Sequence, residues 1–114
     1  MSNQQDIIEI EVSMEDAKHA IELAEKLEKL MNNKQFKEVI LEEYFKNEAV
    51  RLVGLKADPN CQTPEWKQNI ENSLMAISEL RMFFMKIRWQ ANQAEAALED
   101  AKNAHAELLA EGAE

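Results

Sequence analysis

Apolar residues recur along the C-terminal half of this chain at the spacing of one helix face. No glycine or proline lies between Pro64 and Gly112, so the pattern predicts one helix of about 47 residues across that span. From Leu80 onward the apolar steps alternate between four and three, which is the heptad spacing of helices that pack along a seam. The residues expected to face inward are Ile70, Leu74, Ile77, Leu80, Phe84, Ile87, Ala91, Ala94, Leu98, Ala101, His105 and Leu108.

The character of this seam changes at Ala91, where large side chains give way to alanines among acidic residues. We therefore expect a packed half up to Gln90 and an acidic, alanine-rich helical extension over residues 91–114. The extension either projects from the domain or pairs closely with another helix.

Two further amphipathic helices are predicted, over residues 14–32 and 34–57. Ser13 is a suitable N-cap for the first helix, and two asparagines end it at 32–33. Its narrow seam is Ala20, Leu23, Leu27 and Leu30, widened by Ile21 and Ala24. The second helix has a wider apolar face, which includes Phe36, Val39, Ile40, Phe45, Ala49, Leu52 and Val53.

The first twelve residues show a different pattern, in which Ile8, Ile10 and Val12 alternate with glutamates. Period-two alternation is typical of an extended segment. We predict an extended or mobile arm over residues 1–12 that orders against another subunit or a partner.

The stretch "LKADPNCQTPEW" holds both prolines and the single cysteine. Asp58 precedes a proline and is biased away from helix, whereas Thr63, Pro64 and Glu65 together form a strong helix start. The stretch is predicted to be a corner between two helices.

Taken together, these patterns predict an all-α fold. It consists of a helical hairpin of residues 34–57 and 64–90 with the N-terminal helix packed beside it. Residues 13–90 then form the helical domain, and the half-exposed seams predict a homo-oligomer.

Charge bears on the partners that the chain can bind. The 13 basic and 22 acidic residues give a net charge of −9: residues 1–30 and 91–114 carry −5 each, and the residues between them carry +1. Both ends would repel phosphate backbones, which argues against direct binding of nucleic acid. No apolar run approaches the roughly 20 residues that span a bilayer, and no signal peptide is recognisable, so we expect a soluble intracellular protein without membrane contact.

Candidate chemistry is sparse. Asp16 and His19 are spaced like one half of a helical di-metal site, but His105 has no carboxylate three residues before it. Cys61 lies in a loop far in sequence from either histidine. We expect no catalytic residue, no metal and no cofactor, and hence a protein that is not an enzyme.

The most informative segment is "LRMFFMKIRWQ", from Leu80 to Gln90, which is apolar on nearly every side of a helix. Its outward residues are either part of the core or a surface for a partner or for self-association. A nucleic-acid surface is the third alternative, and it agrees least with the charge of the chain. Methionine, aromatic and arginine side chains are enriched at the centres of protein interfaces. The candidate partner-binding residues are Arg81, Met82, Phe83, Met85, Lys86, Arg88 and Trp89. If the hairpin helices are antiparallel, Glu48 and Arg51 could also meet Glu79 and Arg81 across the interface.

The stretches "FKEVILEEYFKNEAVRLVGLKADPN" and "LMAISELRMFF" resemble small helical proteins encoded among the genes of tailed bacteriophages. The resemblance covers residues 36–90 and brings no functional residue with it. It implies a phage structural or assembly protein that binds itself and another phage or host protein, in the host cytoplasm or within the virion. The alternative is an acidic inhibitor or sponge directed at a host defence or nucleic-acid-binding protein.

Overall fold

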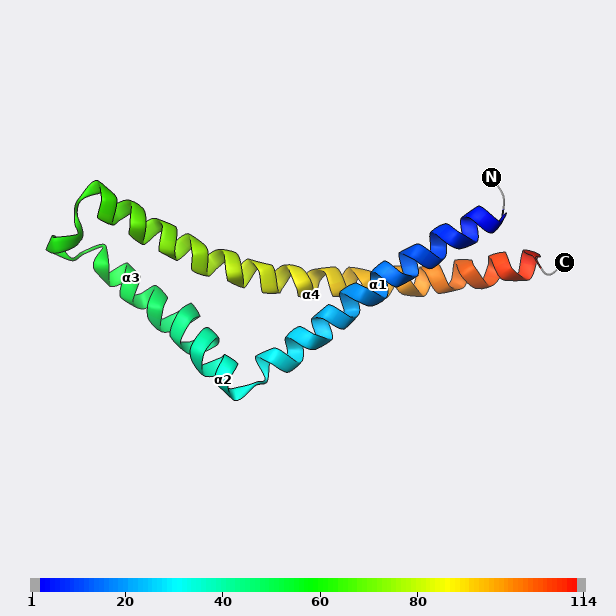
Figure 1. The fold of residues 1–114 in the computed structure, drawn as a ribbon, viewed down its shortest axis with the longest axis horizontal. Helices are drawn as coiled ribbons and strands as arrows, with labels where there is room; N and C mark the ends of the chain where they lie inside the picture. The colour runs from blue at the N-terminus through cyan, green and yellow to red at the C-terminus, as the bar shows by residue number, and fades with distance from the viewer. Residues whose placement is uncertain (1–2, 113–114) are drawn as a thin grey trace. The chain divides into compact units, whose positions relative to one another are not determined.

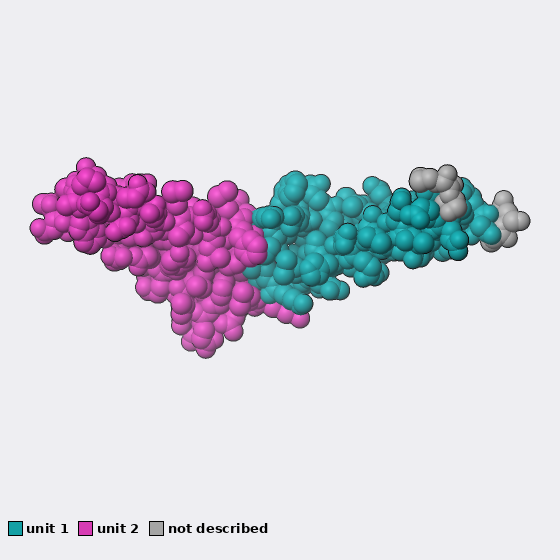
Figure 2. Space-filling model, turned by 45° about the horizontal axis from the view of Figure 1, so that its top comes forward, with its two compact units in different colours: residues 1–27, 86–114 teal, residues 28–85 magenta. Residues whose placement is uncertain are grey.

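A computed structural model describes residues 3–112 of the chain, and all the regular elements in this range are helical (Figure 1). The predicted all-α class is therefore confirmed. The described chain forms two compact units, which are considered separately: unit 1 contains residues 3–27 and 86–112, and unit 2 contains residues 28–85 (Figure 2). The elements are α1 (Asn3–Met31), α2 (Lys34–Phe36), the π-helix η1 (Lys37–Glu48), α3 (Ala49–Leu55), the 3₁₀ turn η2 (Pro59–Cys61) and α4 (Pro64–Gly112).

Helix α4 contributes to both units and runs without a break over 49 residues. Its start follows the predicted signal, because the Thr63 Oγ1 accepts a hydrogen bond of 3.2 Å from the backbone N–H of Trp66. The predicted inner seam is confirmed along its whole length, since all twelve of its residues are buried or half-buried. One face of α4 therefore supplies the inward-facing surface of each unit.

Unit 2 is the predicted helical hairpin. Residues 34–55 run toward the corner, and α4 returns antiparallel to them. The ring centroids of Phe36 and Phe45 each lie 5.9 Å from that of Phe84, at a tilted angle that aromatic pairs favour. Near the corner, the Lys56 Nζ pairs with the Glu71 Oε1 at 2.7 Å. Aromatic packing at one end and an ion pair at the other fix the register of the hairpin.

The first arm of the hairpin departs from a regular α-helix. Twelve residues form the π-helix η1, which is unusually long because π-helical turns normally occur singly. Its i→i+5 bonding brings pairs of residues inward at intervals of four, at positions 40–41, 44–45 and 48–49. The predicted inward positions of Val39 and Val53 are wrong, since both side chains are exposed.

The corner is held by local hydrogen bonds. The Asp58 Oδ1 accepts from the backbone N–H of Asn60 at 2.8 Å, and the Gln62 Nε2 donates to the carbonyls of Lys56 and Asp58 at 2.9 and 2.8 Å. These bonds satisfy backbone groups that the end of one helix leaves unpaired. The two prolines and the cysteine thus belong to a helix–turn–helix corner, as the sequence predicted.

Unit 1 is an antiparallel pair of helices. The Asn3 Nδ2 donates to the carbonyl of Leu108 at 3.1 Å, and the His105 Nε2 lies 3.1 Å from the Glu11 Oε1. This register directs Ala17 and the residues that follow it toward the alanine-rich part of α4. Ala17, Ala91 and Ala94 are all buried. Alanines reach such burial in a two-helix pair only where the backbones approach closely.

The predicted arm over residues 1–12 is wrong, because α1 already begins at Asn3; residues 1 and 2 lie outside the described range. A second pattern overlaps the alternation, with buried or half-buried residues at Ile7, Ile10, Met14, Ala17, Ile21 and Ala24. Its steps of three and four are helical, and α4 supplies the surface that stabilises this helix. The predicted seam is also partly wrong, since Leu23 and Leu30 are exposed whereas Leu27 is buried.

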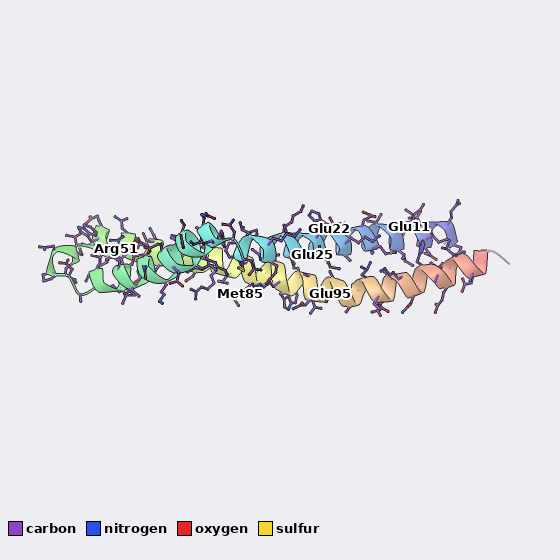
Figure 3. All side chains as sticks on the ribbon, turned by 90° about the horizontal axis from the view of Figure 1, so that it is seen from below. Glu11, Glu22, Glu25, Arg51, Met85 and Glu95 are labelled. Carbon is purple, nitrogen blue, oxygen red and sulfur yellow. The ribbon has the colours of Figure 1, made fainter. Side chains whose placement is uncertain are left out.

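The compact units also divide the chain differently from the predicted domain 13–90 and extension 91–114. Within unit 1, residues 91–112 pack with residues 3–27. Of the two alternatives for the alanine-rich segment, the structure has the close helix pair. Its acidic side chains stay on the outside, as Glu95 does in Figure 3.

Ending the chain after Gln90 should therefore unfold most of α1. Residues 3–27 would lose their partner surface, and most of the stability of a helix in a protein comes from the packing of its apolar face. Circular dichroism should show a loss of helix well beyond that of the 24 deleted residues. A chain ended after Gly112 is the control; unchanged helicity per residue in the shorter chain would contradict the pairing.

Leu52 and Val50 offer a matched test of the unit 2 core, because they lie two residues apart on α3 and are 4% and 69% exposed. Leu52→Ala should lower the free energy of unfolding by about 2–5 kcal/mol through lost burial and a cavity. Val50→Ala should change it by no more than about 0.5 kcal/mol. Urea titration followed by circular dichroism measures both, and equal effects would refute the assigned inward face.

Candidate partner-binding surface on α4

All seven candidate residues are exposed on α4: Arg81, Met82, Phe83, Met85, Lys86, Arg88 and Trp89. Within the same segment, Leu80, Phe84 and Ile87 face inward. Met82, Phe83, Met85 and Trp89 are 64%, 52%, 62% and 62% exposed, so they are not core residues of this chain. We call the seven residues the α4 surface.

Sequence reasoning missed one extension of the α4 surface. Met75, one heptad before Met82, is 57% exposed and is the same type of side chain. The step of seven residues was a signal that could have identified it. Exposed methionines therefore begin about two turns before Met82 on α4.

Arg81 connects the α4 surface to the core of unit 2. Its guanidinium carbon lies 5.1 Å from the centroid of the Phe45 ring, which is a cation–π contact. Arg81 thus contacts an aromatic ring, and not the carboxylates of the predicted cross-helix charge network. Arg51 instead bonds to Glu48 on its own helical segment, with 2.9 Å between its Nε and the Glu48 Oε1, and this carboxylate raises the pKa of the Arg51 guanidinium.

A shallow groove adjoins the α4 surface within unit 2. It lies where η1 and α3 meet α4, and its lining is mostly apolar. The lining residues are Phe45, Ala49, Leu74, Ile77, Ser78, Arg81 and Met82. The groove thus brings one edge of the largely buried Phe45 to the surface beside exposed Met82.

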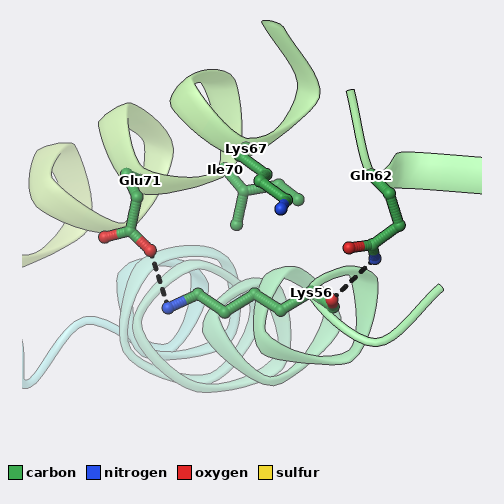
Figure 4. A pocket seen from close by; sticks show the side chains of 5 residues that line it. All are labelled: Lys56, Gln62, Lys67, Ile70 and Glu71. Carbon is green, nitrogen blue, oxygen red and sulfur yellow. Dashed lines mark hydrogen bonds and ion pairs between the residues drawn. The ribbon is translucent and has the colours of Figure 1, made fainter. Parts of the chain in front are cut away.

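A second pocket lies at the corner of the hairpin (Figure 4). Lys56 pairs with Glu71, and Gln62 donates to the Lys56 carbonyl, while Ile70 and Lys67 line the pocket from α4. Its polar groups thus bond chiefly to one another. We therefore regard this pocket as a structural feature of the corner.

The part of the chain that the structure describes contains no candidate metal site. Within residues 3–112 no three His, Cys, Asp or Glu side chains are placed to hold a metal ion. His19 is exposed, and His105 is engaged with Glu11 in unit 1. No helix in this range has the length and apolarity needed to cross a membrane.

Cys61 is 5% exposed in the corner turn. Burial raises the pKa of its thiol, and the nearby carboxylate of Asp58 raises it further. Both causes disfavour the thiolate, which is the nucleophilic form of cysteine. The side chain is therefore a packing element of the corner.

The net charge of the chain is concentrated in one unit. Unit 1 holds 5 basic and 12 acidic residues, for a net −7, whereas unit 2 holds 8 and 9, for −1. Asp6, Glu9, Glu107 and Glu111 line a shallow groove of unit 1 together. The exposed apolar residues of α4 between 75 and 85 accordingly lie in the nearly neutral unit.

Comparison with protein-family models, with curated proteins and with solved structures finds no match for this chain.

The environment of Cys61 predicts that its thiol reacts slowly with alkylating reagents. Its alkylation by iodoacetamide at neutral pH should be at least about tenfold slower in the folded chain than in urea, because burial suppresses both access and the thiolate. The control is Cys61→Ser/Asn60→Cys, which moves the thiol to an exposed position of the same turn. Equal rates for the two folded proteins would contradict the assigned packing role.

Proposed function

We propose that this chain is a non-enzymatic structural or assembly protein that acts through helix-mediated protein–protein contacts. The observation that carries the proposal is the exposure of Met82, Phe83, Met85 and Trp89 on one segment of α4 whose inner face is already packed. Full burial of a large apolar side chain supplies about 1.5–3 kcal/mol, and leaving these four more than half exposed forgoes a large part of it. A partner that covers them recovers this free energy.

The composition of the α4 surface also supports protein recognition. Methionine and aromatic side chains combine large contact area with adaptable shape, and arginine is the charged residue most enriched at interfaces. Arg81 is already oriented by the Phe45 ring, so less of its side-chain entropy is lost on binding. The adjoining groove offers a site for an anchoring apolar side chain of the partner.

The biological setting of the proposal comes from the resemblance of residues 36–90 to small helical proteins of tailed phages. On that basis the partner is a virion or assembly protein, and the chain acts in the host cytoplasm or within the virion. Self-association is part of this proposal. Direct contact with nucleic acid is not, because unit 1 carries a net charge of −7.

One observation favours a second candidate function. The dense carboxylates of unit 1, four of which line one groove, could attract a basic surface of a host defence or nucleic-acid-binding protein. In that function the chain is an acidic inhibitor or sponge, and the acidic groove of unit 1 rather than the α4 surface makes the contact.

Affinity capture from phage-infected lysate with the tagged chain and with Phe83→Ser/Trp89→Ser separates these functions. For an assembly protein, wild type should retain a capsid, portal or tail protein that the variant loses. Both side chains are more than half exposed, so circular dichroism of the variant should be unchanged.

The matched control is Glu9→Gln/Glu107→Gln, which removes two carboxylates from the groove of unit 1. Loss of a host nuclease or polymerase in this variant alone would favour the inhibitor. Loss of helix in Phe83→Ser/Trp89→Ser would show that these residues are core and would refute the α4 surface.

A further inference from the structure

Helix α4 carries a second stripe at heptad spacing. Met75, Ser78, Met82, Met85 and Trp89 follow one another in steps of three, four, three and four. All five are exposed. We call them the outer stripe, and their spacing is the one by which helices pack along a seam.

The outer stripe lies on the side of α4 away from the inner seam. Successive residues of an α-helix are about 100° apart, so Met82 is about 200° from Phe84, and Met85 is displaced by the same angle from Ile87. Phe84 and Ile87 are both buried against their own chain. The outer stripe is therefore distinct from the inner seam. At its edge, Ser78 and Met82 also line the shallow groove beside Phe45.

We propose that a second copy of this chain covers the outer stripe, with the two α4 helices antiparallel about a two-fold axis between Met82 and Met85. This arrangement sets Met82 of each copy against Met85 of the other. It also sets Ser78 against Trp89 of the second copy, so that the smallest side chain of the stripe meets the largest. An isologous pair uses the same surface twice, as this stripe permits.

Charge on the flanks selects the antiparallel direction. In that direction Glu79 lies beside Lys86 of the second copy, which gives two attractive pairs. Arg81 and Arg88 face each other on the opposite flank, but Arg81 is drawn toward Phe45 of its own chain. Parallel pairing instead brings Arg81 beside Lys86 and offers no attractive pair.

The inference deepens the proposed function and rests on it, because it assigns part of the α4 surface to self-association. The pairing segment, from Met75 to Trp89, lies outside the acidic groove of unit 1. The chain can thus dimerise although its net charge is −9. Phe83, Lys86 and Arg88 lie beside the outer stripe and not on it.

Sedimentation velocity of the full chain, under reducing conditions and over a wide range of concentration, tests the pairing. Wild type should show a monomer–dimer equilibrium. Met82→Glu/Met85→Glu should raise the dissociation constant by more than about 100-fold, because each carboxylate enters the seam twice. The control Val50→Glu/Val53→Glu adds the same charge at equally exposed positions of α3 and should leave the constant unchanged.

Charge reversal tests the direction. Glu79→Lys and Lys86→Glu should each weaken the dimer by about fivefold, whereas the double variant should return to within about twofold of wild type. Failure of this rescue would overturn the antiparallel register. A wild type that stays monomeric, or a dimer that only the α3 control disrupts, would overturn the pairing itself. A monomer that still captures a virion protein through Phe83 and Trp89 would leave the proposed function standing without this inference.

Discussion

The apolar inner seam of α4 is the constraint on which both units depend. Of the eleven buried apolar residues in the described chain, six lie on this helix: Ile70, Ile77, Phe84, Ile87, Ala91 and Ala94. None of the described side chains is less than 2% exposed, because each unit is thin. No single position in so shallow a core is enclosed on all sides. Its stability therefore comes from many partly buried side chains that follow one another along the helices.

The sequence was most informative where one helix face carries the whole pattern. The inner seam, the start of α4 at Thr63 and the corner at Asp58 depend on local chemistry and on a period that only helix satisfies, and all three were predicted. The conformation of residues 3–12 was predicted wrongly because two apolar patterns overlap there. Ile8 and Val12 fit a strand, Ile7 and Met14 fit a helix, and only the presence of α4 decides between them.

The hairpin arm shows a different limit. A wide apolar face does not by itself state which of its residues point inward, and the π-helical turns of η1 shift the register by a fraction of a turn. Phe45 and Leu52 consequently face the core while Val39 and Val53 do not. Propensity and periodicity assume regular turns, so nothing in them predicted a π-helix of twelve residues.

The side of α4 opposite the inner seam is exposed because the units are thin. The thinness of the units does not explain which residue types occupy that side. Beyond Ala91 the exposed positions of this helix are mainly asparagine, glutamine and acidic residues, such as Asn92 and Glu95, which keep a long helix soluble. Between Met75 and Trp89 the same side of the helix carries three methionines and a tryptophan. Polar side chains would satisfy the fold equally well at these positions, since they contribute little to either packed seam. This composition supports the proposed contact outside the monomer, and the heptad spacing fits the proposal that the contact is another helix.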